Sequence, residues 1–188
     1  MNIEIKKNLA KNWFILLRDI ICYEIEELEK EFGTKKNKIP KKFKSQIWRK
    51  SDNNDEGGGE FRILNDGLVF EKVGVNFSEV YGKFSKKFSK QVPGTEKNQN
   101  FWASGISVVM HMKNPHVPAI HFNTRFIYTS HGWFGGGMDV TPCIKDNKLK
   151  KWFQKELKKC CNRHNKKYYK KYKKWCDNYF YLPHRKEP

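Results

Sequence analysis

The sequence predicts an α+β fold in which a mainly antiparallel sheet lies between helical segments at the two ends of the chain. Apolar residues recur at helical spacing in residues 8–32 and again in residues 148–181. Between them, residues 61–128 show short apolar runs separated by turn signals, which is typical of hairpins. The chain has 188 residues, 38% hydrophobic and 15% aromatic, so we expect one domain with a sizeable core rather than disorder.

The first helix is predicted from Asn8 to Phe32, and Gly33 is a plausible stop. The polar residues 34–59, which end in three glycines, are expected to form a loop. The apolar runs 61–64 and 68–77 flank Asn65-Asp66-Gly67, a pattern that predicts a β-hairpin.

Two more strands are predicted at residues 102–112 and 119–128, after a connection at residues 83–100. The glycines at 135–137 indicate a turn before a helical tail from about Lys148 to Tyr181. In that tail four aromatic residues recur at helical spacing, which predicts a stripe facing the core: Tyr168, Tyr172, Trp175 and Tyr179.

The strand 119–128 carries polar side chains on one face only. Because successive strand residues point to opposite faces, His121, Asn123 and Arg125 share a face, and Thr124 lies with the apolar residues on the other. Ser107 and His111 share a face of the preceding strand. Such a group needs partners or a ligand if it is dry, and a solvated polar network is the alternative. Arg125 could grip a carboxylate, and His121 could transfer a proton.

Other kinds of site find little support in the pattern. The histidines show no metal-binding motif spacing, Cys160-Cys161 lies within a Lys-rich helix, and the glycine runs lack the Gly-Lys-Ser/Thr ending of a phosphate loop. No apolar run reaches membrane-spanning length, and no signal peptide is evident. Five cysteines without a Cys-x-x-Cys pair predict reduced thiols and a cytoplasmic location.

The net charge of +18 is local, since residues 145–174 hold fourteen basic and two acidic side chains. Only six of the 38 basic residues are arginine, the residue that reads nucleic acids bidentately. A Lys-rich nucleic-acid-binding protein is therefore kept as an alternative, and a solvated helical face is favoured.

Four stretches in order resemble the oxygen-dependent coproporphyrinogen III oxidase family: Gly57–Gly59 with residues 69–78, residues 104–126 including HFNTRF at 121–126, WFGGGMDVTP at 133–142, and residues 173–185. The resemblance covers nearly the whole chain. It implies a large, mainly antiparallel sheet flanked by helices on both faces, of which residues 1–188 form a single incomplete domain, because family members continue for roughly another hundred residues.

The resemblance also implies the chemistry. The family converts two propionates of coproporphyrinogen III to vinyl groups, giving protoporphyrinogen IX in haem biosynthesis, with molecular oxygen as electron acceptor and no organic cofactor. By position, His121 and Asp139 match catalytic residues, and Ser107, Asn123, Thr124 and Arg125 match substrate contacts. The family members are homodimers, and neither nucleic acid nor a membrane span is expected.

Bacterial members are described with a divalent-metal site of four histidines. His111, His121 and His184 occupy three of these positions, and the fourth falls on Gln154, a poorer ligand than imidazole. We expect the 188-residue chain on its own to be inactive, and a porphyrin-binding remnant without catalysis is a further alternative.

Overall fold

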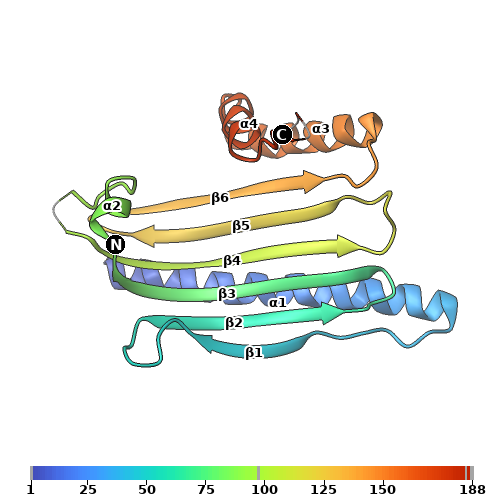
Figure 1. Ribbon diagram of the computed structural model, residues 1–188, viewed down its shortest axis with the longest axis horizontal. Helices are drawn as coiled ribbons and strands as arrows, with labels where there is room; N and C mark the ends of the chain where they lie inside the picture. The colour runs from blue at the N-terminus through green and yellow to red at the C-terminus, as the bar shows by residue number, and fades with distance from the viewer. Residues whose placement is uncertain (1, 97, 185, 187–188) are drawn as a thin grey trace.

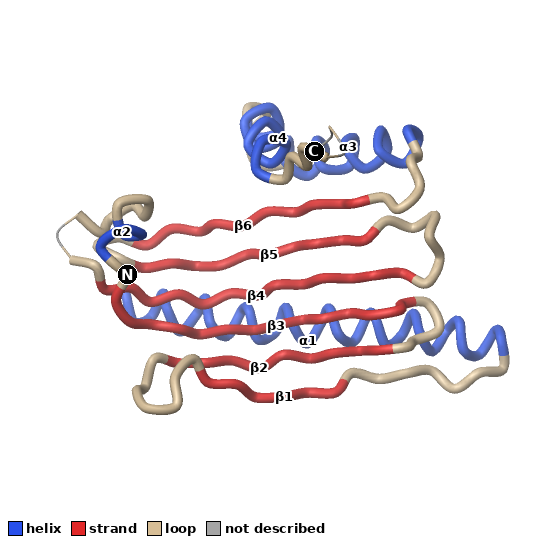
Figure 2. The backbone as a smooth tube through the Cα atoms, viewed as in Figure 1, coloured by secondary structure: helices blue, strands red, loops and turns tan. Residues whose placement is uncertain are grey.

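Six strands form one sheet in the order of the sequence, each antiparallel to the next (Figures 1 and 2). This computed structural model describes residues 2–96, 98–184 and 186, so Arg185 and Pro188 lie outside the described residues. The strands are β1 (Lys44–Arg49), β2 (Gly57–Asn65), β3 (Phe70–Lys83), β4 (Asn100–Met112), β5 (Ala119–Tyr128) and β6 (Gly132–Thr141). The α+β class and both predicted hairpins are confirmed.

Helix α1 (Ile3–Lys36) crosses one face of the sheet, over β3 and β4. Its buried side is centred on Phe14, Cys22 and Ile25, which join a core with Val75 of β3 and Val108 of β4. The helix continues past Gly33 and ends where Asn37 adopts the left-handed conformation. Gly33 is nevertheless required, because a Cβ there would lie 2.6 Å from the carbonyl oxygen of Lys38 as the chain turns back.

A buried carboxylate joins α1 to the turn between β2 and β3. Glu29 is fully buried and accepts three backbone hydrogen bonds, from the N–H groups of Leu68 at 2.5 Å, Val69 at 2.8 Å and Phe70 at 3.0 Å. These donors would otherwise be unpaired at the turn, so the side chain satisfies them and fixes the helix to the hairpin.

The helical tail consists of two helices rather than one. A short helix α2 (Lys86–Ser89) precedes β4, and the tail forms α3 (Asn147–Asn162) and α4 (Tyr168–Tyr179) beside β6. Asp146 begins α3 by accepting from the N–H groups of residues 148 and 149. The predicted core stripe on α4 is wrong: its four aromatic residues are 39–76% exposed. Among the described elements, α4 packs mainly against α3 and β6 and not against the core.

Both glycine triplets lie within strands, which corrects the loop expected at 34–59 and the turn expected at 135–137. Gly57–Gly59 begin β2, pairing with the unpredicted strand β1 and with β3, and Gly135–Gly137 lie in β6. A Cβ on Gly59 would lie 2.0 Å from the carbonyl oxygen of Phe77, and one on Gly136 would lie 2.3 Å from that of Asn123. These glycines therefore permit close approach of neighbouring strands.

Within the described part of the chain, no helix combines the length and apolar character that crossing a membrane requires.

Candidate active site

The strand register brings the predicted polar residues into rows across the face of the sheet opposite α1. One row runs from Asn76 on β3 through Ser107 on β4 and Asn123 on β5 to Gly137 on β6. The adjacent row on one side pairs Arg125 with Gly105 and Gly135. We call this surface the polar face. Its rows follow from the strand register, which the sequence alone had left open.

His121 and Asp139 form the next row of the polar face, as direct partners on β5 and β6. Both are partly buried, and the hydroxyl of Thr141 donates to Asp139 at 3.0 Å. The ring of Phe180, which follows α4, stands edge-on to the His121 ring with centroids 6.1 Å apart. The helical tail thus reaches the polar face, opposite the face that α1 covers.

Two hydrogen bonds orient the polar side chains. Arg125 donates through Nη2 to Oδ1 of Asn123 at 3.0 Å, and Trp48 donates through Nε1 to Oδ1 of Asn76 at 3.0 Å. Arg125 is exposed and pairs with no carboxylate among the described residues, so its remaining donors can receive an anionic ligand. Trp48, Asn76 and Phe180 were not predicted; the alternation of Asn76 with Ser78 on β3 was the one available signal.

Thr124 is the predicted substrate contact that the structure separates from the others. Its register partner is Ile106, a 3% exposed member of the core beneath α1, so Thr124 belongs to the covered face.

The three histidines proposed as metal ligands are not gathered into one group among the described residues. The β4 partner of His121 is Val109. His111 lies two residues further along β4, on the same face of the sheet as His121. Gln154 of α3 instead accepts a hydrogen bond from the Tyr169 hydroxyl at 2.9 Å, and His184 is exposed after α4. No three His, Cys, Asp or Glu side chains of the described ranges are grouped to hold a metal ion. This residue set therefore does not fit the implied metal, and no step is derived through one.

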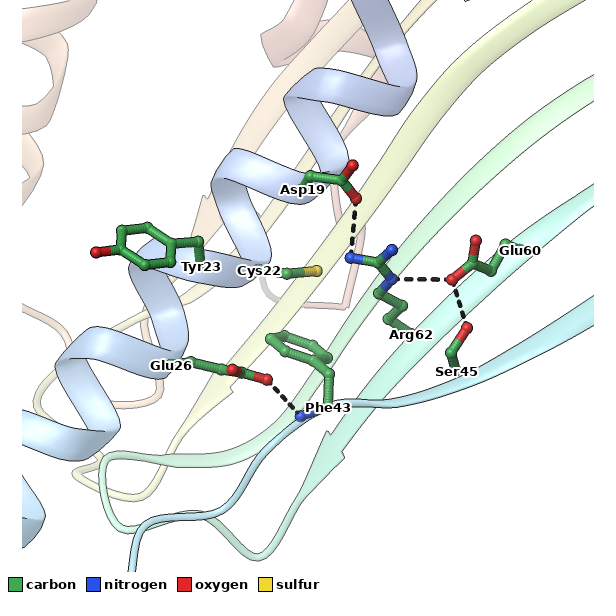
Figure 3. Close-up of a pocket in the computed structure, with 8 residues that line it drawn as sticks. All are labelled: Asp19, Cys22, Tyr23, Glu26, Phe43, Ser45, Glu60 and Arg62. Atoms are coloured by element: carbon green, nitrogen blue, oxygen red, sulfur yellow. Dashed lines mark hydrogen bonds and ion pairs between the residues drawn. The ribbon is translucent and has the colours of Figure 1, made fainter. Parts of the chain in front are cut away.

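A separate cavity of about 330 Å³ lies on the α1 side of β1 and β2 (Figure 3). Its Arg62 donates to Glu60 and pairs with Asp19, while Cys22 lies beneath. Burial raises the pKa of the Cys22 thiol to about 11. Burial alone would also raise the pKa of Glu60, but hydrogen bonds from Ser45 and Arg62 outweigh it and lower that pKa. This network joins α1 to the sheet edge and contains none of the predicted site residues.

Comparison with known proteins identifies the family. Residues 10–188 match the family described as coproporphyrinogen III oxidase. The chain belongs to the coproporphyrinogen III oxidase family. It is 47% identical, over its whole length, to proteins named oxygen-dependent coproporphyrinogen-III oxidase from Rickettsia africae and Rickettsia akari. It is also 47% identical over 185 residues to the protein of that name from Rickettsia bellii.

The chain spans 66% of the length of the Rickettsia africae relative, and 97% of the chain is matched to 65% of the Rickettsia bellii protein. The family assignment confirms the resemblance drawn from the four motif stretches, and it does not support the nucleic-acid-binding alternative. All four stretches contribute to the polar face: Asn76 comes from the first, Ser107, His121, Asn123 and Arg125 from the second, Asp139 from the third, and Phe180 from the fourth.

Proposed function

We propose that this protein acts as a coproporphyrinogen III oxidase on its polar face. The reaction converts two propionates of coproporphyrinogen III to vinyl groups and yields protoporphyrinogen IX in haem biosynthesis. In each conversion the bond to the carboxylate breaks, carbon dioxide leaves, and a hydrogen leaves the carbon next to the ring. That hydrogen leaves with the electron pair of its bond, and together with one proton the two electrons reduce molecular oxygen to hydrogen peroxide. No organic cofactor is proposed. The names of the relatives support both the substrate and the oxidant.

The observation that carries this proposal is the placement of Arg125, Asn123 and Ser107 in neighbouring rows beside His121 and Asp139. Arg125 would bind a propionate through charge-assisted hydrogen bonds, with Asn123 and Ser107 adding neutral ones. Asp139, next to His121, would accept hydrogen bonds from the pyrrole N–H groups, and His121 would transfer a proton. The sheet holds these side chains on a rigid support, which favours a fixed orientation of the substrate.

We further propose a homodimer in the cytoplasm. The location is supported by five free cysteines, at least two of them exposed, because exposed thiols persist in a reducing compartment.

Purified chain should first be tested for binding of coproporphyrin III by fluorescence. Oxygen-dependent turnover of coproporphyrinogen III, and the variants below, should be measured in a chain extended to the length of the relatives, because the 188 residues alone are expected to be inactive. Arg125→Ala should weaken substrate capture by about 1–3 kcal/mol, the cost of losing a charged hydrogen bond. The matched control is Arg49→Ala, which removes an exposed arginine of β1. His121→Ala should instead lower turnover at saturating substrate. Unchanged saturation in Arg125→Ala would refute the assigned role, and binding without turnover would favour a non-catalytic porphyrin-binding protein.

A further inference from the structure

Helix α4 carries an aromatic stripe that stays exposed in the described structure. Its four members recur at helical spacing and are 39–76% exposed: Tyr168, Tyr172, Trp175 and Tyr179. The rings of Tyr168 and Tyr172 lie side by side with centroids 5.2 Å apart, so the first half of the stripe is a continuous aromatic surface. Exposed apolar patches that are rimmed by polar residues mark interaction sites. The stripe therefore indicates a binding partner.

Three lysines run beside the stripe. Lys167, Lys171 and Lys174 each stand one residue before a member of the stripe, so they lie along one flank of it, and we call them the flank lysines. All three are exposed, and none forms an ion pair with a described residue. The ammonium group of Lys171 lies 5.7 Å from the centre of the Tyr172 ring. They belong to the most basic part of the chain, because residues 145–181 hold fourteen basic and three acidic side chains, a net +11.

The stripe ends at the polar face. Its last member, Tyr179, meets the next residue, Phe180, edge-on with ring centroids 4.9 Å apart. Phe180 in turn stands edge-on to His121. A Cβ on Gly137 would lie 3.8 Å from the Phe180 ring, so this ring lies beside the row of the polar face that contains Asn123. Aromatic side chains therefore connect the exposed stripe of α4, which lies beside β6 in Figure 1, to the proposed reaction site.

We propose that the stripe and the flank lysines form a capture site, which binds the carboxylate-bearing tetrapyrrole before it enters the polar face. The ligand has an apolar ring system with carboxylates at its rim, and α4 offers aromatic rings with ammonium groups along their flank. The pyrrole rings stack on the aromatic side chains, and the propionates pair with the flank lysines. Arg125 then receives a propionate at the polar face. The inference rests on the proposed function and adds the route by which its substrate arrives.

Electrostatic attraction at this site favours the substrate over the product. Two propionates have become vinyl groups in the product, which is therefore attracted less strongly to the flank lysines. A surface of one sign raises association rates of opposite charges by about 10- to 1,000-fold at low ionic strength. Charges at the far edge of the sheet contribute little, because β1 and β6 are separated by about 24 Å, and screening is effective beyond about 10 Å at 0.1 M salt. The charge near α4, and not the net charge of the chain, should control capture.

Stopped-flow fluorescence with coproporphyrin III, the stable oxidised form of the substrate, tests the charge. In the extended chain at about 0.1 M salt, reversing all three flank lysines to glutamate should lower the association rate constant at least about tenfold. The matched control is Lys38→Glu, Lys41→Glu and Lys42→Glu together, which makes the same change of charge in the exposed loop between α1 and β1. It should change the rate constant less than about twofold. Equal losses in the two variants would refute a local capture site.

Replacement of Trp175 tests the aromatic part of the site. Trp175→Ala should lower the same association rate constant about fivefold, because an aromatic contact made during capture is lost. Trp175→Phe, which keeps an aromatic ring, should restore most of this loss. Trp152→Ala, which removes an exposed tryptophan of α3 outside the stripe, is the matched control and should leave the rate constant unchanged. Circular dichroism confirms that each variant is folded.

Turnover separates capture from catalysis. None of the α4 variants should lower kcat at saturating substrate, because the capture site acts before the substrate reaches the reacting groups. A lower kcat in Trp175→Ala would contradict a role confined to capture.

Three outcomes distinguish this inference from the proposed function. If the unmodified extended chain does not bind coproporphyrin III, the proposed function is wrong, and the capture site is wrong with it. If it binds with the same association rate in all variants, only the capture site is refuted. Losses that occur in the 188-residue chain and are absent from the extended chain would also refute the capture site, because the added segment would then cover the stripe.

Discussion

Replacement of Glu29 tests how the fold is held together, because its carboxylate receives three buried backbone donors and pairs with no cation among the described residues. In Glu29→Gln the amide oxygen can keep the two donors now shared by Oε1, from Val69 and Phe70. The amide nitrogen would then face the N–H of Leu68, the donor now bound by Oε2. One charged hydrogen bond is lost and one donor is left unpaired.

We expect Glu29→Gln to lower the free energy of unfolding by about 2–3 kcal/mol, the cost of one charged hydrogen bond to a buried group. Glu29→Ala leaves all three donors unpaired and opens a cavity, so it should cost at least about 4 kcal/mol. Urea unfolding followed by circular dichroism measures both, and Glu29→Gln should lower the midpoint by about 1 M. All variants must be compared at one protein concentration, because dimer dissociation would contribute to the measured stability.

The matched control is Glu31→Gln, which removes an exposed carboxylate two residues along α1 whose ion pair with Lys35 is solvent-screened. It should leave the free energy of unfolding essentially unchanged, because water screens an exposed ion pair. A Glu29→Gln protein as stable as the Glu31→Gln control would show that the three hydrogen bonds do not hold α1 to the β2–β3 turn. The reasoning about the buried carboxylate would then be wrong.

Three further predictions concern titration and backbone space. The pKa of Glu60 is lowered from 4.5 in the folded state, so the stability that its carboxylate contributes is present above pH 4.5 and is lost as the pH falls below that value. Urea midpoints at pH 7 and pH 3 should therefore differ less in Glu60→Gln than in the unmodified chain. The pKa of Cys22 is raised from 9.0 to about 11, so the stability that the neutral thiol contributes is present below pH 9 and is lost as the pH rises towards 11. A Cys22→Ala variant should lack this loss of stability at alkaline pH in the same assay. Gly105→Ala should destabilise the sheet by about 1–3 kcal/mol, because its Cβ would lie 2.4 Å from the carbonyl oxygen of Thr124. Gly74→Ala, whose Cβ would have no atom within 4 Å, should be tolerated. Equal urea midpoints for the two variants would contradict this prediction.

Periodicity predicted the elements whose apolar residues meet a partner within the described chain. The helix at 8–32 and the strands at 102–112 and 119–128 were found because each buries one regular face against the core. Strand β1 was missed because it is an edge strand with an exposed, polar pattern, so alternation gave no signal. The aromatic stripe of α4 had the correct period but stays largely exposed in the described structure, since periodicity shows that a face exists and not what covers it.

The loop and the turn predicted at the two glycine triplets were wrong for a different reason. Glycine is common in turns because it tolerates positive φ, yet of the six residues only Gly57 has a positive φ, at 82°. In β2 and β6 the absence of a side chain matters instead, because neighbouring strands approach closely there. A sequence pattern cannot separate these two uses of glycine, since both depend on a missing Cβ and only the strand partners distinguish them.

The polar face could be predicted in part, because alternation within one strand needs no tertiary information. His121, Asn123 and Arg125 follow from β5 alone, whereas Asn76 and Asp139 join them only through the register of β3 with β4 and of β5 with β6. A slip of one residue in β5 would replace these three side chains with Phe122, Thr124 and Phe126. The buried face prevents that slip: Phe126 is 5% exposed and contacts Trp102 edge-on beneath α1. The apolar contacts on one side of the sheet thus fix which polar groups stand together on the other.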